Sequence, residues 1–165
     1  MSILLNGIGL VDTSNNPISI HRKIFVFDGV KDIGKTYVIS LLCRYLKYKY
    51  QGFYHAFQRQ VDPNNGPEDE VRFIFNSPKG IIGITSEGDT AKVLKPDLEF
   101  LADSVKCDII ICAGRPDKPI THRTIADVAS RWHYSIHNID MNIITRMCPP
   151  MEKEIAAFDM AVNVF

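Results

Sequence analysis

Short apolar runs and longer amphipathic stretches alternate along the chain. The run Lys23–Phe27 is rich in β-branched and aromatic residues and ends at Asp28 and Gly29, which is typical of a buried strand. From Lys35 onward the apolar residues recur at helical spacing. They are Val38, Leu41, Leu42, Tyr45 and Leu46. We therefore expect a strand, a short loop and then a helix that ends near Gly52.

The same alternation continues beyond this helix. The apolar runs Val71–Phe75 and Ile81–Thr85 flank the turn-forming segment Asn76–Gly80, which predicts a β-hairpin with a five-residue turn. Further strands are expected at Phe53–Gln58, Asp108–Cys112, His133–Ile139 and Met160–Phe165. Further helices are expected at Ala91–Val105, Thr121–Trp132 and Met151–Phe158. Since proline suits the first turn of a helix, the first of these helices starts either at Ala91 or near Pro96.

Strands that alternate with helices favour an α/β fold. We expect three layers: a mostly parallel sheet with helices on both faces and one antiparallel hairpin. The 165 residues fit a single domain, 1–165. Within it, residues 1–22 are expected to add a small N-terminal hairpin from Ile3–Val11 and Ile18–Ile20, flanking the sheet.

Charge and the first residues restrict the class of partner. Lys and Arg together number 19, as do Asp and Glu, so the formal net charge is zero. Proteins that bind nucleic acid by counterion release usually carry a basic excess, so the charge gives no evidence for a nucleic-acid partner. Met1–Leu5 is apolar but short and lacks a basic flank, unlike a signal peptide or a membrane span. We expect a cytoplasmic protein that does not enter a membrane.

Cysteine and histidine spacing gives no metal motif. The four cysteines show no C-x-x-C pair, and the histidines show no H-E-x-x-H pair. We expect the cysteines to be reduced residues of the core. They are Cys43, Cys107, Cys112 and Cys148.

One segment matches a phosphate-binding motif. Residues Gly29–Thr36 read GVKDIGKT and satisfy the pattern G-x-x-x-x-G-K-[ST]. They follow an expected strand and open an expected helix, which is the context that this motif requires. Glycines let successive backbone N–H groups turn inward around an anion, and the start of the helix adds its positive end. In this arrangement Lys35 reaches the β- and γ-phosphates of a nucleotide, and the hydroxyl of Thr36 is a ligand of Mg²⁺.

The expected nucleotide-binding residues are this loop and the residue after it. They are Gly29, Val30, Lys31, Asp32, Ile33, Gly34, Lys35, Thr36 and Tyr37. We expect Lys35 to be an exposed, catalytic loop residue, so that its loss abolishes turnover and leaves the fold intact. The guanine-specifying pattern N-K-x-D is absent from the sequence, which favours ATP over GTP.

The segment Phe25–Thr36, FVFDGVKDIGKT, resembles the first strand and phosphate-binding loop of the P-loop NTPases. The nearest loops are those of nucleotide kinases of the thymidylate-kinase type, which read F-E-G-x-D-G-x-G-K-[ST]. Asp28 stands where these kinases often have Glu, and Lys31 and Asp32 are unusual in the loop. The resemblance implies a P-loop NTPase fold and Mg²⁺-dependent phosphoryl transfer from ATP to a nucleotide or another small molecule.

Such a site also needs an acid at the end of a neighbouring strand. Ile81–Thr85 is followed closely by Glu87 and Asp89, whereas Asp108–Cys112 is followed by no acid until Asp117. We therefore favour Asp89 as the metal-side acid and Glu87 as the group that orients water or an acceptor. The alternative is that these residues cap the next helix, since acids also suit a first helical turn.

Arg115 lies just past the strand Asp108–Cys112. A guanidinium group at this position stabilises the charge of a phosphoryl group in the transition state. The alternative is a loop arginine paired with Asp117, and the sequence favours neither.

Three functions agree with these residues. The first is an ATP-dependent phosphotransferase. The second is a slow ATPase or GTPase whose nucleotide state switches the binding of a protein partner through the acidic segment Val61–Glu70, which is also typical of an ordinary exposed loop. The third is a non-catalytic nucleotide-binding module, which follows if Glu87 and Asp89 lie far from the phosphate loop.

Overall fold

A computed structural model describes residues 21–31, 33–50 and 71–141 in full, and the backbone of residues 4–6, 9–11 and 54–56. Several of the expectations lie outside these residues. They concern Asp32, Gly52, Cys148, Ile18–Ile20, Val61–Glu70, Met151–Phe158 and Met160–Phe165.

Strands and helices alternate in the described chain. The strands are β1 (Leu4–Asn6), β2 (Gly9–Val11), β3 (Lys23–Asp28), β4 (Tyr54–Ala56), β5 (Arg72–Ser77), β6 (Gly80–Thr85), β7 (Ile109–Gly114) and β8 (Ser135–Asp140). The helices are α1 (Lys35–Lys49), α2 (Ala91–Glu99) and α3 (Pro119–Trp132). A π-helical segment, η1 (Phe100–Ser104), continues α2.

Six strands form one mixed sheet in the order β4-β5-β6-β7-β3-β8. Strands β6, β7, β3 and β8 run parallel, and β5 is antiparallel to both of its neighbours. Strand β3 lies inside the sheet, where Lys23 is in register with Ile109 of β7 and with Ser135 of β8. The expected mostly parallel sheet with an antiparallel hairpin is confirmed.

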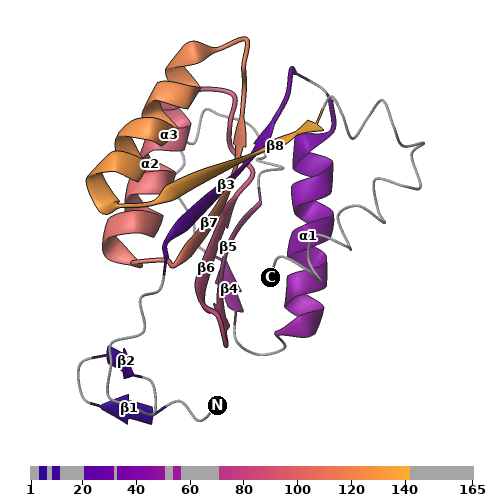
Figure 1. Ribbon diagram of the computed structural model, residues 1–165. Coiled ribbons are helices and arrows are strands. Elements are labelled where there is room, and N and C mark those ends of the chain that lie inside the picture. Colours follow the sequence, from indigo (N-terminus) through magenta and orange to yellow (C-terminus); the bar gives the residue numbers. More distant parts are fainter. Residues whose placement is uncertain are drawn as a thin grey trace, which may run out of the picture.

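Helices cover both faces of this sheet. Helix α1 lies on one face, and α2 and α3 lie together on the other (Figure 1). Along β3, Phe27 belongs to the core beneath α1, whereas Ile24 and Val26 belong to the core beneath α2 and α3. A parallel strand covered on both sides must be apolar at successive positions, which explains the uninterrupted apolar run of β3.

The hairpin between β5 and β6 is tighter than expected. Ser77 pairs with Gly80, so the turn holds only Pro78 and Lys79 rather than five residues. Gly80 has a φ of +110°, which glycine adopts without strain. The Asp108 carboxylate accepts a hydrogen bond from the Ile81 N–H at 2.8 Å and anchors this turn to the start of β7.

Helix α2 begins at Ala91, so the alternative start near Pro96 is wrong. Pro96 lies inside the helix, where its missing N–H leaves the Lys92 carbonyl without its usual helical donor. The helix nevertheless forms because Leu94 and Leu98 are fully buried against the sheet. Its last turns widen into η1, where the Val105 N–H donates to the Phe100 carbonyl.

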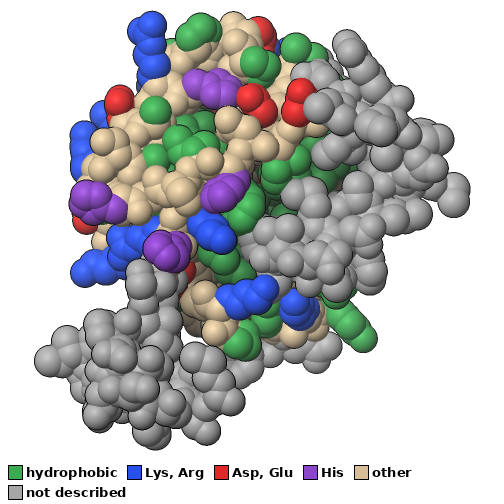
Figure 2. Space-filling model, in the orientation of Figure 1, with side chains coloured by type: hydrophobic (Ala, Val, Ile, Leu, Met, Phe, Trp, Pro, Cys, Tyr) green, Lys and Arg blue, Asp and Glu red, His purple; other side chains and the backbone are tan. Residues whose placement is uncertain are grey.

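The ends of the described chain agree in part with the sequence. An N-terminal hairpin is present, but both of its strands, β1 and β2, lie within Ile3–Val11, so the expected single strand Ile3–Val11 is wrong. Strand β4 lies within the expected Phe53–Gln58. Strand β8 is the last strand on its side of the sheet among the described residues. The face of the molecule that it crosses carries exposed histidines among both basic and acidic side chains (Figure 2).

The topology creates a crevice at the carboxyl ends of β3 and β7. The chain leaves β3 into α1 on one face of the sheet and leaves β7 into α3 on the other (Figure 1). In open α/β sheets, ligands bind where adjacent connections diverge in this way. The Gly29–Thr36 loop starts at this point.

Candidate functional site

The Gly29–Thr36 segment joins β3 to α1 directly. Asp28 ends the strand, and Lys35 is the first residue of the helix. Gly34 precedes the helix with a φ of 93°, a conformation that side chains other than glycine rarely adopt. The strand, loop and helix required by the sequence motif are therefore present, and Asp32 alone among the loop residues is outside the description.

Lys35 folds back onto its own loop. Its ammonium group donates to the carbonyl oxygens of Gly29 at 2.6 Å and Val30 at 2.7 Å. The residue is 7% exposed, so the expectation of an exposed loop lysine is wrong. The reason is that the loop curls around the ammonium group and uses it to satisfy two carbonyls. Burial lowers the pKa of Lys35, and the charge of Asp89 partly offsets this effect.

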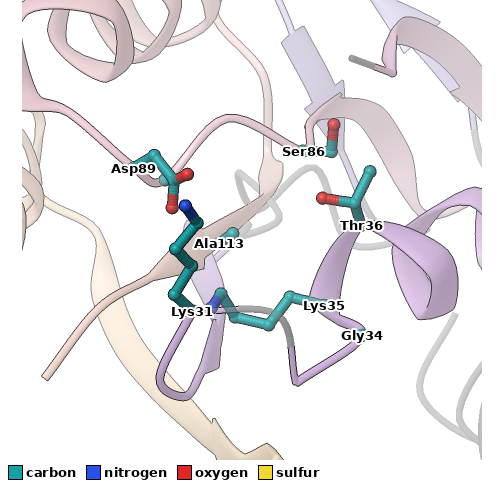
Figure 3. A pocket seen from close by; sticks show the side chains of 8 residues that line it. Lys31, Gly34, Lys35, Thr36, Ser86, Asp89 and Ala113 are labelled. Atoms are coloured by element: carbon teal, nitrogen blue, oxygen red, sulfur yellow. The ribbon is translucent and has the colours of Figure 1, made fainter. Parts of the chain in front are cut away.

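A cavity of about 310 Å³ opens beside this loop. Its walls come from the loop, from the segment after β6 and from the end of β7. The lining residues are Lys31, Gly34, Lys35, Thr36, Ser86, Gly88, Asp89 and Ala113. In Figure 3 the hydroxyl of Thr36 faces this space, and the side chain of Lys31 extends toward Asp89. The cavity thus combines two lysines, two hydroxyl-bearing residues and a carboxylate.

Asp89 reaches the cavity although β6 is not the neighbour of β3. Strand β7 lies between them, so the segment after β6 has to cross the end of β7. Gly88 makes this crossing close: a Cβ at Gly88 would lie 2.6 Å from the carbonyl oxygen of Ala113. Because such a contact with backbone is too short for any side chain, the glycine is required there.

Arg115 is nearly buried between two acids. Its Nη1 lies 3.1 Å from Asp89 Oδ1, its Nε donates to Asp117 Oδ1 at 3.0 Å, and its Nη2 contacts Asp117 Oδ2. The hydrogen bonds that Arg115 donates to Asp117 lower the pKa of Asp117 and raise the pKa of Arg115. The pairing that the sequence left as an alternative is therefore present, and it also includes Asp89. Arg115 is not among the residues that line the cavity.

Glu87 is placed differently from Asp89. It is buried, its Oε2 lies 3.9 Å from Arg72 Nη2, and it is not among the cavity-lining residues. Its Oε1 accepts the N–H of Asp89 at 3.3 Å. Glu87 therefore supports the backbone at Asp89 with one carboxylate oxygen and lies near Arg72 with the other.

The sequence interpretation missed a buried polar cluster behind the cavity. Arg72 Nε donates to Asp97 Oδ2 at 2.7 Å, and the Thr85 hydroxyl donates to the same oxygen at 2.8 Å. The cluster joins β5, β6 and α2 below the segment that carries Asp89. A signal was present, because an arginine opens the apolar run of β5 and Asp97 precedes Leu98 on the buried side of α2.

The other described residues of the expected nucleotide-binding set are not among those that line the cavity. Val30 is 45% exposed and Tyr37 is 50% exposed. Ile33 packs against the core beneath α1, and Gly29 is buried with its N–H directed at the Gly114 carbonyl. These residues shape the loop, whereas Lys31, Gly34, Lys35 and Thr36 face the cavity.

Comparisons with protein-family models, with curated proteins and with solved structures give no match to this chain. The ligand of the site is therefore inferred from the residues of the site itself. In the part of the chain that the structure describes, no helix is long and apolar enough to cross a membrane.

Proposed function

We propose that this chain is a P-loop protein that binds a nucleoside triphosphate, ATP by preference, and transfers a phosphoryl group to a nucleotide or another small molecule. The observation that carries the proposal is the cavity in which Gly34, Lys35 and Thr36 of the loop meet Asp89. An anion there lies at the N-terminal end of α1, whose positive dipole end favours phosphate. Lys31 and Lys35 add positive charge on the same side.

The oxygen atoms of this cavity suit Mg²⁺. The Thr36 hydroxyl and the Asp89 carboxylate come from two different elements and line the same space. In the described residues, no group of three or more His, Cys, Asp or Glu is placed to hold a metal ion. Mg²⁺ at nucleotides usually takes one or two protein oxygens, with phosphates and water as its other ligands, and Thr36 and Asp89 would supply two such oxygens. When bound, it would neutralise charge on the β- and γ-phosphates.

Phosphate binding would exchange contacts that already exist. Lys35 would leave the carbonyls of Gly29 and Val30 for phosphate oxygens, which relieves its desolvation with an opposite charge. Arg115 Nη1 lies 3.1 Å from Asp89 Oδ1, and this contact would position the carboxylate for Mg²⁺. If the γ-phosphoryl group lies within hydrogen-bond distance of Arg115, the guanidinium would also stabilise the charge of the transition state.

A regulatory ATPase or GTPase remains the second candidate. Asp89 lines the phosphate-side cavity, which favours either catalytic function over a passive nucleotide-binding module. Transfer of phosphate to an added acceptor separates the first candidate from the second.

The test is thermal unfolding with and without Mg²⁺ and ATP, GTP, ADP or AMP. A ligand at about a hundred times its dissociation constant adds about 2.7 kcal/mol, which raises Tm by roughly 5–10 °C for a domain of this size. Lys35→Ala should lose the shift with triphosphates, and Lys79→Ala, in the exposed β5–β6 turn, should keep it. No shift with any nucleotide in the unaltered protein contradicts the proposal.

A further inference from the structure

A carboxylate and an imidazole meet beside the phosphate loop. Asp28 Oδ1, at the end of β3, lies 3.1 Å from His122 Nε2, in the first turn of α3. The two side chains are 19% and 34% exposed, so the pair is sheltered and still accessible to a small molecule. The sequence motifs assign no function to His122.

The fold makes room for this pair. Gly114 is in register with Asp28 on the adjacent strand. A Cβ at Gly114 would lie 2.7 Å from Val26 Cγ1, 3.2 Å from Asp28 Oδ1 and 3.4 Å from His122 Nε2. Any larger residue would therefore press on both members of the pair. The glycine at the end of β7 lets the imidazole approach the carboxylate across the crevice between β3 and β7.

The pair is joined to the phosphate loop through one residue. Gly29 follows Asp28, and its carbonyl accepts the hydrogen bond from the Lys35 ammonium group. Neither Asp28 nor His122 is among the residues that line the cavity, so an acceptor at His122 would lie beside the cavity. A phosphate bound by Lys35 would lie near Gly29, which directly follows Asp28 at the carboxyl end of β3.

We propose that His122 is the general base for the phosphoryl acceptor and that Asp28 is its positioning residue; this rests on the proposed function. An ionised carboxylate only accepts hydrogen bonds, so Nε2 carries the proton toward Asp28 and Nδ1 keeps a free electron pair. The acceptor class is a hydroxyl-bearing molecule, such as a nucleoside, a nucleotide or water. The same logic of a base oriented by a carboxylate operates in other transfer enzymes.

The proton and the electron pairs balance in this step. Nδ1 of His122 takes the proton of the acceptor hydroxyl as the hydroxyl oxygen forms a bond to the γ-phosphorus. The bond from the γ-phosphorus to the β–γ bridging oxygen breaks, and its electron pair leaves with the nucleoside diphosphate. Asp28 stabilises the resulting imidazolium, which then gives its proton to water.

The experiment follows γ-labelled Mg²⁺–ATP with a panel of nucleosides and nucleoside monophosphates, and with water as the acceptor in their absence. His122→Ala and Asp28→Asn should lower kcat by about a hundredfold or more while the dissociation constant of Mg²⁺–ATP stays within about twofold of the unaltered value. Added imidazole should restore part of the activity of His122→Ala, which a structural role would not allow. His133→Asn is the matched control, because His133 is exposed with a φ of 61° that asparagine tolerates.

The outcomes separate the two proposals. Absence of Mg²⁺–ATP binding by the unaltered protein overturns the proposed function itself. Binding without any transfer or hydrolysis overturns the general-base proposal, as does turnover that survives in His122→Ala. Loss of activity in His122→Ala and Asp28→Asn, with retained ATP binding and rescue by imidazole, supports it.

Discussion

Lys35 stabilises the loop between β3 and α1 through two hydrogen bonds. The ammonium group caps the carbonyls of Gly29 and Val30 from inside the loop. Under the proposed function, Lys35 would bind phosphate as well as hold its own loop together. Its structural contribution and its proposed ligand-binding contribution are measured by different experiments.

Lys35→Ala should destabilise the protein even without nucleotide. The substitution leaves two sheltered carbonyls without their charged donor, which costs about 1.5–3 kcal/mol. Urea unfolding of the ligand-free protein measures this loss. Lys79→Ala, at an exposed turn, should change the free energy of unfolding by less than about 0.5 kcal/mol. Equal stability of the two variants would show that the lysine contacts contribute nothing to the fold.

The pair of Arg115 and Asp117 should make stability depend on pH in acid. Hydrogen bonds from Arg115 hold the pKa of Asp117 below its ordinary value of 3.8. The ionised carboxylate therefore stabilises the fold fully above 3.8, and this contribution is lost as the pH falls below 3.8 through the lowered pKa. The stability difference between the unaltered protein and Asp117→Asn should shrink over that range. A difference that is constant from neutral pH to below 3.8 contradicts the linkage.

At the scale of elements, a buried ion pair connects the β5–β6 hairpin to α2. Arg72 and Asp97 have side chains only 6% and 4% exposed. On the outer side of the same helix, Lys95 and Glu99 form an exposed pair at 3.9 Å. The two pairs allow buried and solvated charge to be compared within one helix.

Asp97→Ala should cost about 3–5 kcal/mol, because it leaves the buried guanidinium without its nearest carboxylate. Lys95→Ala should cost less than about 1 kcal/mol, because solvent screens the exposed pair. Chemical unfolding of both variants measures these values. A cost for Asp97→Ala as small as that for Lys95→Ala would mean that Glu87, 3.9 Å from Arg72, replaces the lost partner.

Most elements could be predicted from periodicity, and the exceptions have physical causes. Pro96 suggested a helix start, but burial of Leu94 and Leu98 outweighs one missing hydrogen bond. The turn after β5 is shorter than expected because Gly80 adopts a left-handed φ, and a sequence does not reveal which glycine will do so. Local patterns thus located the elements, while tertiary packing set their ends.

At the scale of the whole molecule, the three described cysteines are all in the core. Burial raises the pKa of Cys43, Cys107 and Cys112 to about 12. In a Cys148→Ser background these thiols should not react with a thiol reagent at neutral pH until the protein unfolds, because the thiolate is the reactive form. Absorbance of the released chromophore with and without urea measures this. Rapid labelling of any of the three in the native protein contradicts their burial.

The site was predictable only where the residues are close in sequence. The loop Gly29–Thr36 could be recognised because the strand before it and the helix after it are adjacent in sequence. The approach of Asp89 depends on strand order, on the crossing of β7 and on Gly88, which no local pattern encodes. The contact of His122 with Asp28 depends on α3 returning over β3, and neither residue signals the other.

The central position of β3 has a consequence for how the chain acquires its structure. Lys23 of β3 pairs with Ile109 of β7 and with Ser135 of β8. Both strands that flank β3 in the six-stranded sheet are therefore synthesised long after β3. Closing such long loops is slow, because the entropy is lost before the contacts form. On the ribosome the β5–β6 hairpin can pair early, whereas β3 stays an unpaired apolar segment until β7 and β8 have emerged. The strand that leads into the Gly29–Thr36 loop should therefore benefit from chaperones during synthesis.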